Sequence, residues 1–328
     1  MCTAITFKTK NHYFGRNLDL EYSYQETVTI TPRTYPFHFR HVTAPKNQFA
    51  MIGMATVADN YPLYYEATNE KGLSMAGLNF PGNAVYQRKT PDTDNIAPFE
   101  LIPWILSQCE NLEQALKLLT QANLINEAFN DTFSLTPLHW LIADNTGAMT
   151  IEPVASGLKI YENPVGVLTN NPPFDYHMQN LNNYLNLTSE EPKNRFASTA
   201  PLEPYSRGMG AMGLPGDLSS ASRFVRATFT KLNSRCADTE SASISQFFHI
   251  LGSVAQQEGC VKVGDRYEKT VYSSCCNTTK GIYYYTTYEN SQITAVYLNN
   301  APLNGSNLIS YPLVTGQQIR VVNPSMWN

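Results

Sequence analysis

The stretch MCTAITFKTKNHYFGRNLDL (residues 1–20) decides how the chain begins to fold. Two strand-like runs, 3–9 and 12–19, lie on either side of Lys10 and Asn11, a pair suited to a turn. We therefore predict a hairpin in which the numbers of facing residues add up to roughly 21.

That register places Asp19 opposite Cys2, with Arg16 nearby. A methionine followed by a small residue is the usual substrate of methionine aminopeptidase, so we expect Met1 to be removed. Cys2 then has a thiol, with a reference pKa of about 8.5, and a free α-amine, with a reference pKa of about 7.7–8.0. Because the amine can take the proton of the thiol, one residue supplies both nucleophile and base. Asp19 would accept hydrogen bonds from the amine and fix its rotamer, and the positive charge of Arg16 would favour the thiolate.

A cysteine at position 2 also has a simpler interpretation, as a second residue without any role. The chain has further cysteines at positions 109, 236, 260, 275 and 276, and a papain-like protease would use an internal cysteine activated by histidine. These cysteines show no CxxC spacing and the six histidines show no HExxH spacing. We therefore expect mostly buried free thiols and no metal site.

Composition limits the classes of protein to consider. With 328 residues, of which 42% are hydrophobic and 15% charged, the chain can bury a sizeable core as one large domain or two smaller ones. A net charge of −4 argues against nucleic acid as a partner. No apolar run approaches the roughly 18 residues of a membrane span, and the N-terminus lacks the pattern of a secretory signal. We expect a cytoplasmic protein that binds no membrane.

Strand patterns stand at both ends of the chain and helical patterns between them. Beyond the hairpin, the strand-like segments are 26–33, 72–80, 139–154, 157–171 and 272–298. The helical segments are 97–125, 172–185, 220–236 and 241–254. Without a repeat or an obvious linker, this order predicts a single α+β domain over residues 1–328, with layered sheets and helices outside. Segment 188–220 is rich in Pro, Gly and Ser, which predicts a long functional loop, either a lid or an assembly loop.

Four segments together resemble one known family. They are 1–24, 61–82, 166–177 and 214–227, and they occur in the order and spacing of the choloylglycine hydrolases, which include bile salt hydrolases and penicillin V acylases. The resemblance implies an N-terminal-nucleophile (Ntn) hydrolase fold. This fold is a four-layer αββα sandwich of two mostly antiparallel sheets flanked by helices, usually assembled as a homotetramer.

The same resemblance implies a set of catalytic residues, namely Cys2, Arg16, Asp19, Asn79, Asn170 and Arg223. In it Cys2 is the nucleophile, ordered by Arg16 and Asp19, and Arg223 lies near the thiol. The side-chain amide of Asn170 and the backbone N–H of Asn79 would form the oxyanion hole. Taken singly, Asn170 could be a turn residue, Asp19 a hairpin cap and Arg223 a solvated helix charge.

The resemblance also suggests residues that contact substrate. The implied wall residues are Leu20, Tyr24, Tyr65, Ala67 and Phe80, with mobile loops at about 56–66 and 126–138 around the mouth of the pocket. Ser206-Arg207-Gly208 resembles a variant associated with taurine conjugates in lactobacillus-type members of the family. A guanidinium suits the spread charge of a sulfonate, although a solvated loop arginine is the simpler interpretation of Arg207.

These features predict an amidase that hydrolyses the C24 amide bond of bile salts conjugated with glycine or taurine, with no cofactor. Penicillin V acylase activity is the nearest alternative. Asn79 disfavours it, because penicillin V acylases commonly have tyrosine at the matching position. Acyl-homoserine-lactone acylase activity and an inactive ligand-binding relative are weaker alternatives.

Overall fold

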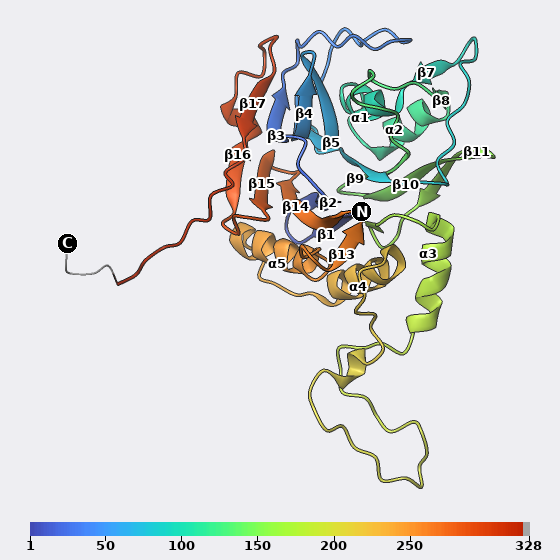
Figure 1. Cartoon of the computed structure of the whole chain (residues 1–328), viewed down its shortest axis with the longest axis vertical. Helices are drawn as coiled ribbons and strands as arrows, with labels where there is room; N and C mark the ends of the chain where they lie inside the picture. Colours follow the sequence, from blue (N-terminus) through green and yellow to red (C-terminus); the bar gives the residue numbers. More distant parts are fainter. Residues whose placement is uncertain (324–328) are drawn as a thin grey trace.

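Two antiparallel sheets lie face to face, and helices cover their outer faces (Figure 1). The structure is a computed structural model that describes residues 1–323. Short helices α1 and α2 pack on one sheet, and the longer α4 and α5 pack on the other. The predicted four-layer αββα sandwich is confirmed.

The first sheet contains both strands of the N-terminal hairpin. Its order is β12 (Val167–Leu168), β1 (Cys2–Lys8), β2 (His12–Leu20), β14 (Arg266–Asn277), β15 (Ile282–Thr287) and β16 (Thr294–Tyr297), with β13 (Val261–Val263) also on β14. The second sheet has the order β11 (Gly157–Glu162), β10 (Gly147–Val154), β9 (Leu138–Asp144), β6 (Ser74–Asn79), β5 (Tyr61–Asn69), β4 (Met51–Ala58), β3 (Thr27–Thr31) and β17 (Ile309–Pro312). A separate parallel pair joins β7 (Asp94–Ile96) to β8 (Ala122–Leu124).

The helices occupy the middle of the chain, as predicted. They are α1 (Leu101–Leu106), α2 (Leu112–Leu119), α3 (Phe174–Leu181), α4 (Ser220–Asn233) and α5 (Glu240–Gly252), with 3-10 turns at Pro98–Glu100, Asn182–Tyr184, Met209–Ala211 and Leu298–Asn300. None of the helices in residues 1–323 has the length and apolar character needed to cross a bilayer.

The continuous helical pattern predicted over 97–125 is wrong in part. The helix stops after Leu106, and a second helix begins at Leu112. Asn111 is its N-cap, and the Asn111 side chain accepts a hydrogen bond of 3.0 Å from the Gln114 backbone N–H. The last residues form β8 instead, because their backbone pairs with β7. The apolar spacing alone does not distinguish such a short strand from another helical turn.

The hairpin forms with a register one residue away from the prediction. Lys8 pairs with His12, so the turn has three residues, and the Thr9 N–H donates to the Asn11 carbonyl at 3.0 Å. Facing numbers therefore add up to 20, which places Leu18 rather than Asp19 opposite Cys2. The extra turn residue moves every partner by one position.

This register separates the two faces of the hairpin. Because facing numbers add up to an even number, the side chains of even-numbered residues such as Cys2 and Arg16 share one face of the hairpin. This face is turned toward the second sheet. Asp19 faces the helical layer, and its backbone pairs with Met1 through hydrogen bonds of 2.7 and 3.0 Å. The hairpin thus presents chemical groups toward both sides of its sheet.

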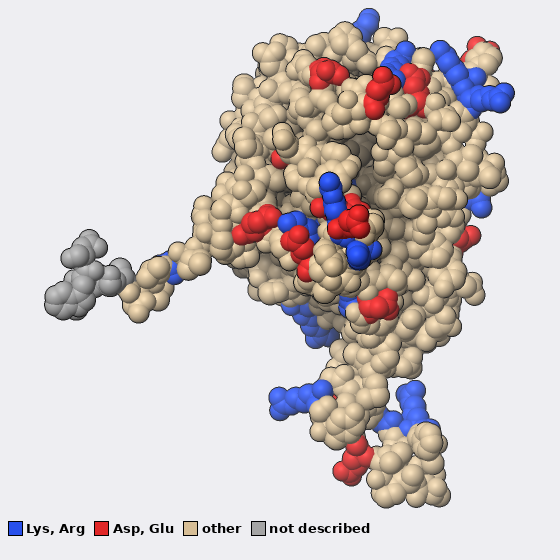
Figure 2. Space-filling view, viewed as in Figure 1, with Lys and Arg blue, Asp and Glu red and all other residues tan. Residues whose placement is uncertain are grey.

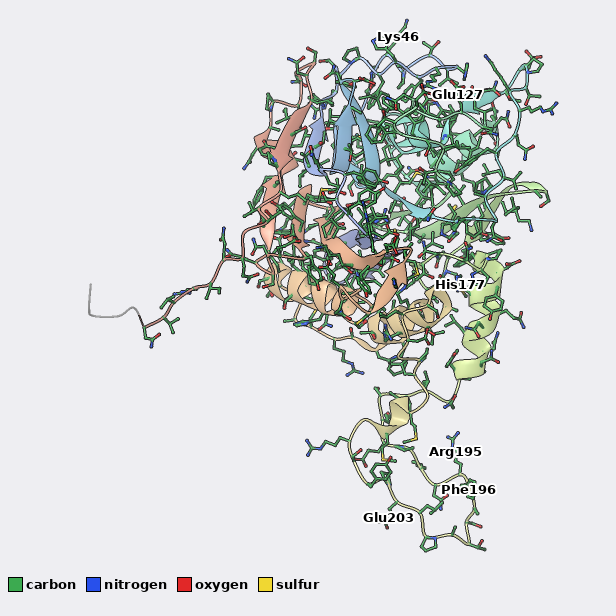
Figure 3. The ribbon with its side chains drawn as sticks, viewed as in Figure 1. Lys46, Glu127, His177, Arg195, Phe196 and Glu203 are labelled. Atoms are coloured by element: carbon green, nitrogen blue, oxygen red, sulfur yellow. The ribbon has the colours of Figure 1, made fainter. Side chains whose placement is uncertain are left out.

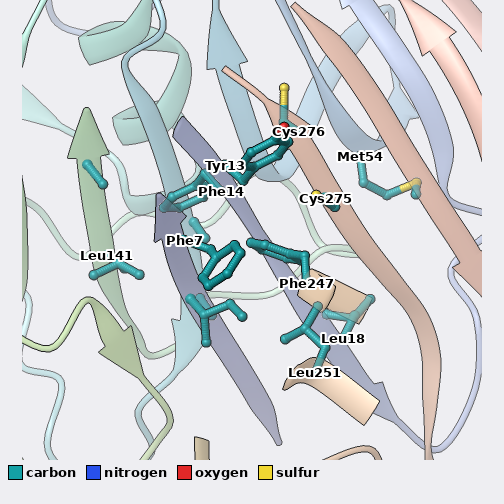
Figure 4. Packing of buried hydrophobic residues seen from close by; sticks show 14 of the residues in the cluster. Phe7, Tyr13, Phe14, Leu18, Met54, Leu141, Phe247, Leu251, Cys275 and Cys276 are labelled. Carbon is teal, nitrogen blue, oxygen red and sulfur yellow. The ribbon is translucent and has the colours of Figure 1, made fainter. Parts of the chain in front are cut away.

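The core between the first sheet and its helices is largely aromatic. Phe247 of α5 lies beside Phe7 of β1, and both are buried (Figure 4). Cys275 and Cys276 are neighbours on β14 and are also buried, as predicted. Full burial of one phenylalanine contributes about 1.5–3 kcal/mol, so this packing fixes the sheet that bears Cys2.

Candidate active site

Cys2 begins β1 close to the middle of one face of the molecule, where the N-terminus lies (Figure 1). Cys2 as a whole residue is 3% exposed. Its backbone N–H donates to Asn170 Oδ1 at 2.8 Å. Met1 is present in this structure, so that N–H is a peptide amide standing where the α-amine would be after processing.

Arg16 approaches Cys2 from the neighbouring strand and is fully buried. Its Nη1 donates to the carbonyls of Tyr65 at 3.0 Å and Gly77 at 2.5 Å. Burial works against the charge, but attraction to the ionisable side chains of Cys2, Tyr272, Glu66 and Asp19 outweighs it and raises the pKa of Arg16. The guanidinium therefore stays charged in its buried position.

Asp19 is buried, and one of its two carboxylate oxygens accepts no hydrogen bond from residues 1–323. Oδ1 accepts a hydrogen bond of 2.6 Å from the Thr270 hydroxyl, whereas Oδ2 has no partner among residues 1–323. Burial raises the pKa of Asp19, although Arg223, the N-terminal ammonium and Thr270 act against that rise. A buried acceptor without a donor is costly, so Oδ2 is suited to a donor such as a free amine.

Asn170 connects Cys2 to the second sheet. Its Oδ1 accepts from the Cys2 backbone and from Arg223 Nη2, both at 2.8 Å, and these two donors fix the orientation of the amide. Its Nδ2 donates to the Asn79 carbonyl at 2.7 Å. The two asparagines predicted for the oxyanion hole are thus in direct contact, and their role remains a prediction.

Arg223 holds the backbone of Cys2. Nη1 donates to the Cys2 carbonyl at 2.5 Å and to the Thr3 hydroxyl at 2.6 Å, and Nε donates to the Leu218 carbonyl at 3.0 Å. Burial lowers the pKa of Arg223, against the attraction of Asp19 and Cys2. We predicted a position near the Cys2 thiol, and the structure shows contacts with the main chain of Cys2.

A cavity of about 330 Å³ opens from Cys2. The face drawn in Figure 2 is hollowed near the N-terminus, with acidic and basic side chains gathered beside the hollow. The predicted wall residues Leu20, Tyr24 and Tyr65 line the cavity, as do Arg16 and Asn79.

Two predicted wall residues lie elsewhere. Ala67 is buried on the α1 side of the second sheet, because a bulge on β5 at Tyr65 breaks the alternation of side chains. Phe80 follows Asn79, so its ring faces the other way and stacks on His139 at 4.3 Å. Neither residue is part of the cavity wall.

Sequence reasoning missed much of the aromatic wall. Phe99, Ile102, Phe129 and Phe133 line the cavity, and Phe99 contacts Phe129 edge to face. Phe129 and Phe133 fall within the predicted mouth loop 126–138. The prediction of that loop was the signal from which these two wall residues could have been found.

One arginine clamps that mouth loop. Arg40 Nη1 donates to Glu127 Oε1 at 2.7 Å and to the Ala128 carbonyl at 2.6 Å, and its Nη2 donates to the Phe129 carbonyl. Hydrogen bonds from His41 and Arg40 lower the pKa of Glu127 in spite of partial burial. An ion pair and backbone contacts therefore hold the mouth loop in place beside the cavity.

Ser206 and Arg207 are exposed on the long loop that projects from the body. Figure 3 shows other loop residues, Arg195, Phe196 and Glu203, far from Glu127 at the cavity mouth. The loop of this chain does not reach its own cavity. Within residues 1–323 there is also no group of His, Cys, Asp and Glu side chains arranged to hold a metal ion.

Comparisons with known proteins agree with this geometry. Residues 2–311 match the model of a family described as linear amide C-N hydrolases, choloylglycine hydrolase family. The chain is 56% identical over 324 residues to the bile salt hydrolase/transferase of Lactiplantibacillus plantarum, covering 98% of this chain and 100% of the relative.

Solved structures are similar as well. A mutant of the conjugated bile acid hydrolase from Clostridium perfringens matches with a TM-score of 0.90 and 35% identity, covering 98% of this chain and 100% of the other. Penicillin V acylase from Agrobacterium tumefaciens matches with a TM-score of 0.71, over 96% of this chain and 92% of the other. At 16% identity, that second likeness shows a shared fold alone.

Proposed function

Because this chain belongs to the choloylglycine hydrolase family of linear amide C–N hydrolases, we propose that it hydrolyses the C24 amide of bile salts conjugated with glycine or taurine. The observation that carries the proposal is Cys2 at the wall of an aromatic cavity, with its backbone held by Asn170 and Arg223. The apolar wall suits a steroid, and the names of the relatives point to the same substrates.

The mechanism begins when Met1 has been removed. The free α-amine of Cys2 takes the thiol proton while Asp19 Oδ2 accepts a hydrogen bond from the amine. The thiolate attacks the C24 carbonyl, and the charged Arg16 stabilises the anionic form of the sulfur. Asn170 Nδ2 and the Asn79 N–H donate to the resulting oxyanion, for which Nδ2 must exchange its present bond to the Asn79 carbonyl.

Collapse of the tetrahedral intermediate breaks the C–N bond. The α-ammonium returns its proton to the leaving nitrogen, and glycine or taurine departs from an acyl thioester. Water then attacks the thioester with the amine as base, which releases the bile acid and restores the thiol. Every proton transfer uses the amine of Cys2.

Product analysis tests the proposed function. The enzyme is incubated separately with taurocholate, glycocholate and penicillin V, and released taurine, glycine and 6-aminopenicillanic acid are measured. We expect free amino acid and cholate from the two conjugates at rates well above penicillin cleavage, since Asn79 lies at the cavity wall. Faster cleavage of penicillin V than of the conjugates would identify the chain as a penicillin acylase. If none of the three substrates gave a product, the alternative of an inactive ligand-binding relative would remain.

We further propose a preference for taurine conjugates and a cytoplasmic homotetramer of single-domain subunits. Arg207 lies on the projecting loop, so it can reach a substrate only in a neighbouring subunit. In that position its guanidinium would contact the sulfonate at the cavity mouth.

Replacing Ser206 and Arg207 together by glycine is expected to lower the taurocholate-to-glycocholate rate ratio about two- to fivefold. That range corresponds to an exposed charge contact of up to about 1 kcal/mol. The ratio of kcat/KM values is measured for native and variant enzyme. Arg195→Gly, which removes another exposed arginine of the same loop, serves as the matched control. An unchanged ratio in the double variant would remove the proposed taurine contact.

A further inference from the structure

His139 of β9 is fully buried and hydrogen-bonded at both ring nitrogens. Nδ1 lies 3.0 Å from Glu152 Oε1, and Nε2 lies 3.0 Å from the Thr169 carbonyl. A neutral imidazole donates from one nitrogen only, and both partners here are oxygens. Each ring nitrogen of His139 therefore faces an oxygen, that of Glu152 on one side and that of Thr169 on the other.

Burying a histidine and a carboxyl side chain together is expensive, and an apolar pair of similar volume would often stabilise a fold better. Its neighbours suggest why it is present. Thr169 directly precedes Asn170, and the His139 ring stacks on Phe80, which directly follows Asn79. The pair thus contacts the neighbours of both asparagines assigned to the oxyanion hole.

Two more contacts fix the same segment. Glu152 Oε1 accepts a hydrogen bond of 3.0 Å from the Phe174 N–H at the start of α3. From that helix, His177 Nε2 lies 2.9 Å from the Asn170 carbonyl, and its ring stacks on Phe224 of α4. Burial lowers the pKa of His177 to about 4, so its ring is neutral and donates from Nε2. Two buried imidazoles therefore hold two consecutive carbonyls.

We propose that His139, paired with Glu152, and His177 are positioning residues for the oxyanion hole. They fix the backbone of Thr169 and Asn170 so that the Asn170 amide faces both Cys2 and Asn79. None of the three lines the cavity, so each acts through the asparagines rather than on the substrate. This inference rests on the proposed function for its amide assay.

The test separates oxyanion stabilisation from reactivity of the nucleophile. Glu152→Gln and His177→Leu are compared with native enzyme for kcat and KM on taurocholate, and for the rate at which iodoacetamide alkylates Cys2. Alkylation needs the thiolate but no oxyanion donor. We expect kcat to fall roughly 10- to 100-fold, which is less than the roughly 100- to 1000-fold loss found when an oxyanion donor is removed outright, because here the donors stay and only their position changes. KM and the alkylation rate should stay within about threefold of native.

Two control variants separate a positioning role from a general structural role. His177→Gln keeps a donor for the Asn170 carbonyl and should recover most of the kcat lost in His177→Leu. His249→Leu removes an exposed histidine of α5 and should change nothing. An unchanged kcat in both Glu152→Gln and His177→Leu would overturn the proposal. Parallel loss of kcat and alkylation, or no recovery in His177→Gln, would also overturn it by showing a general structural role.

A second readout does not depend on turnover. An apolar aldehyde forms a thiohemiacetal with Cys2 and protects the thiol from iodoacetamide, and its oxygen needs the same donors. Both variants should weaken this protection at least about tenfold, and equal protection would count against positioning. A native enzyme that binds the aldehyde but cleaves no bile salt conjugate would refute the proposed function alone.

Discussion

Cys2→Ser enzyme is expected to lose at least roughly a thousandfold in kcat on taurocholate. Loss of a catalytic nucleophile costs on the order of 10⁶ in a serine protease, and a serine here retains a weak nucleophile. The α-amine matches the reference pKa of a thiol within about one unit, whereas an alcohol is a far weaker acid. Kinetics on the purified variant, with mass spectrometry to verify removal of Met1, measure the effect.

The substitution leaves the surroundings of residue 2 in place. Asn170 and Arg223 contact the backbone of Cys2, and a serine preserves both contacts. A loss of activity is therefore a loss of chemistry rather than of folding. Cys260→Ser changes an exposed cysteine and is the matched control. Retention of more than about a tenth of native activity in Cys2→Ser would contradict the assignment.

Buried cysteines elsewhere are poor alternatives as nucleophiles. Burial raises the pKa of Cys109 and Cys276 to about 12, and it raises that of Cys275 as well. A thiol with such a pKa carries almost no thiolate at neutral pH. A papain-like protease needs an internal reactive cysteine, and the raised pKa of Cys109, Cys275 and Cys276 makes these three thiols unsuited to that role.

The sequence predicted the hairpin because its two strands and its turn are local. It missed the register by one residue, since Lys10 and Asn11 do not reveal whether Thr9 belongs to the turn. The same limit explains Ala67, because nothing in the local pattern indicates a bulge at Tyr65. Strand alternation is reliable only where the ladder is regular.

Local sequence patterns could not show which residues distant in sequence come together at the site. Asn170 and Arg223 lie 168 and 221 residues from Cys2 in sequence, and only the family resemblance connected them. The pairing of β17 with β3, which joins the C-terminal segment to the second sheet, has no local signal either. His139 and His177 were noted only as histidines without metal spacing, because their partners become visible only in the folded chain.

Enzyme produced with a cleavable leader directly before Cys2 is expected to be inactive until the leader is removed. A peptide nitrogen cannot take the thiol proton, so nucleophile and base are no longer on one residue. Asp19 Oδ2 also remains without an amine donor. We expect kcat/KM on taurocholate to be at least roughly a hundredfold lower before cleavage, the usual contribution of general base catalysis.

The structure itself argues that such a protein folds normally. With Met1 in place, the Cys2 N–H still donates to Asn170, and the Met1 ammonium contacts Glu268 at a partly exposed position. Preceding residues therefore have a route to solvent without displacing β1. A leader cut by a site-specific protease gives the same polypeptide before and after release, which makes each sample its own control. A Cys2→Ser protein with the same leader should stay inactive after cleavage. Full activity in the uncut enzyme would show that the α-amine is not the base, and a papain-like arrangement would then have to be sought.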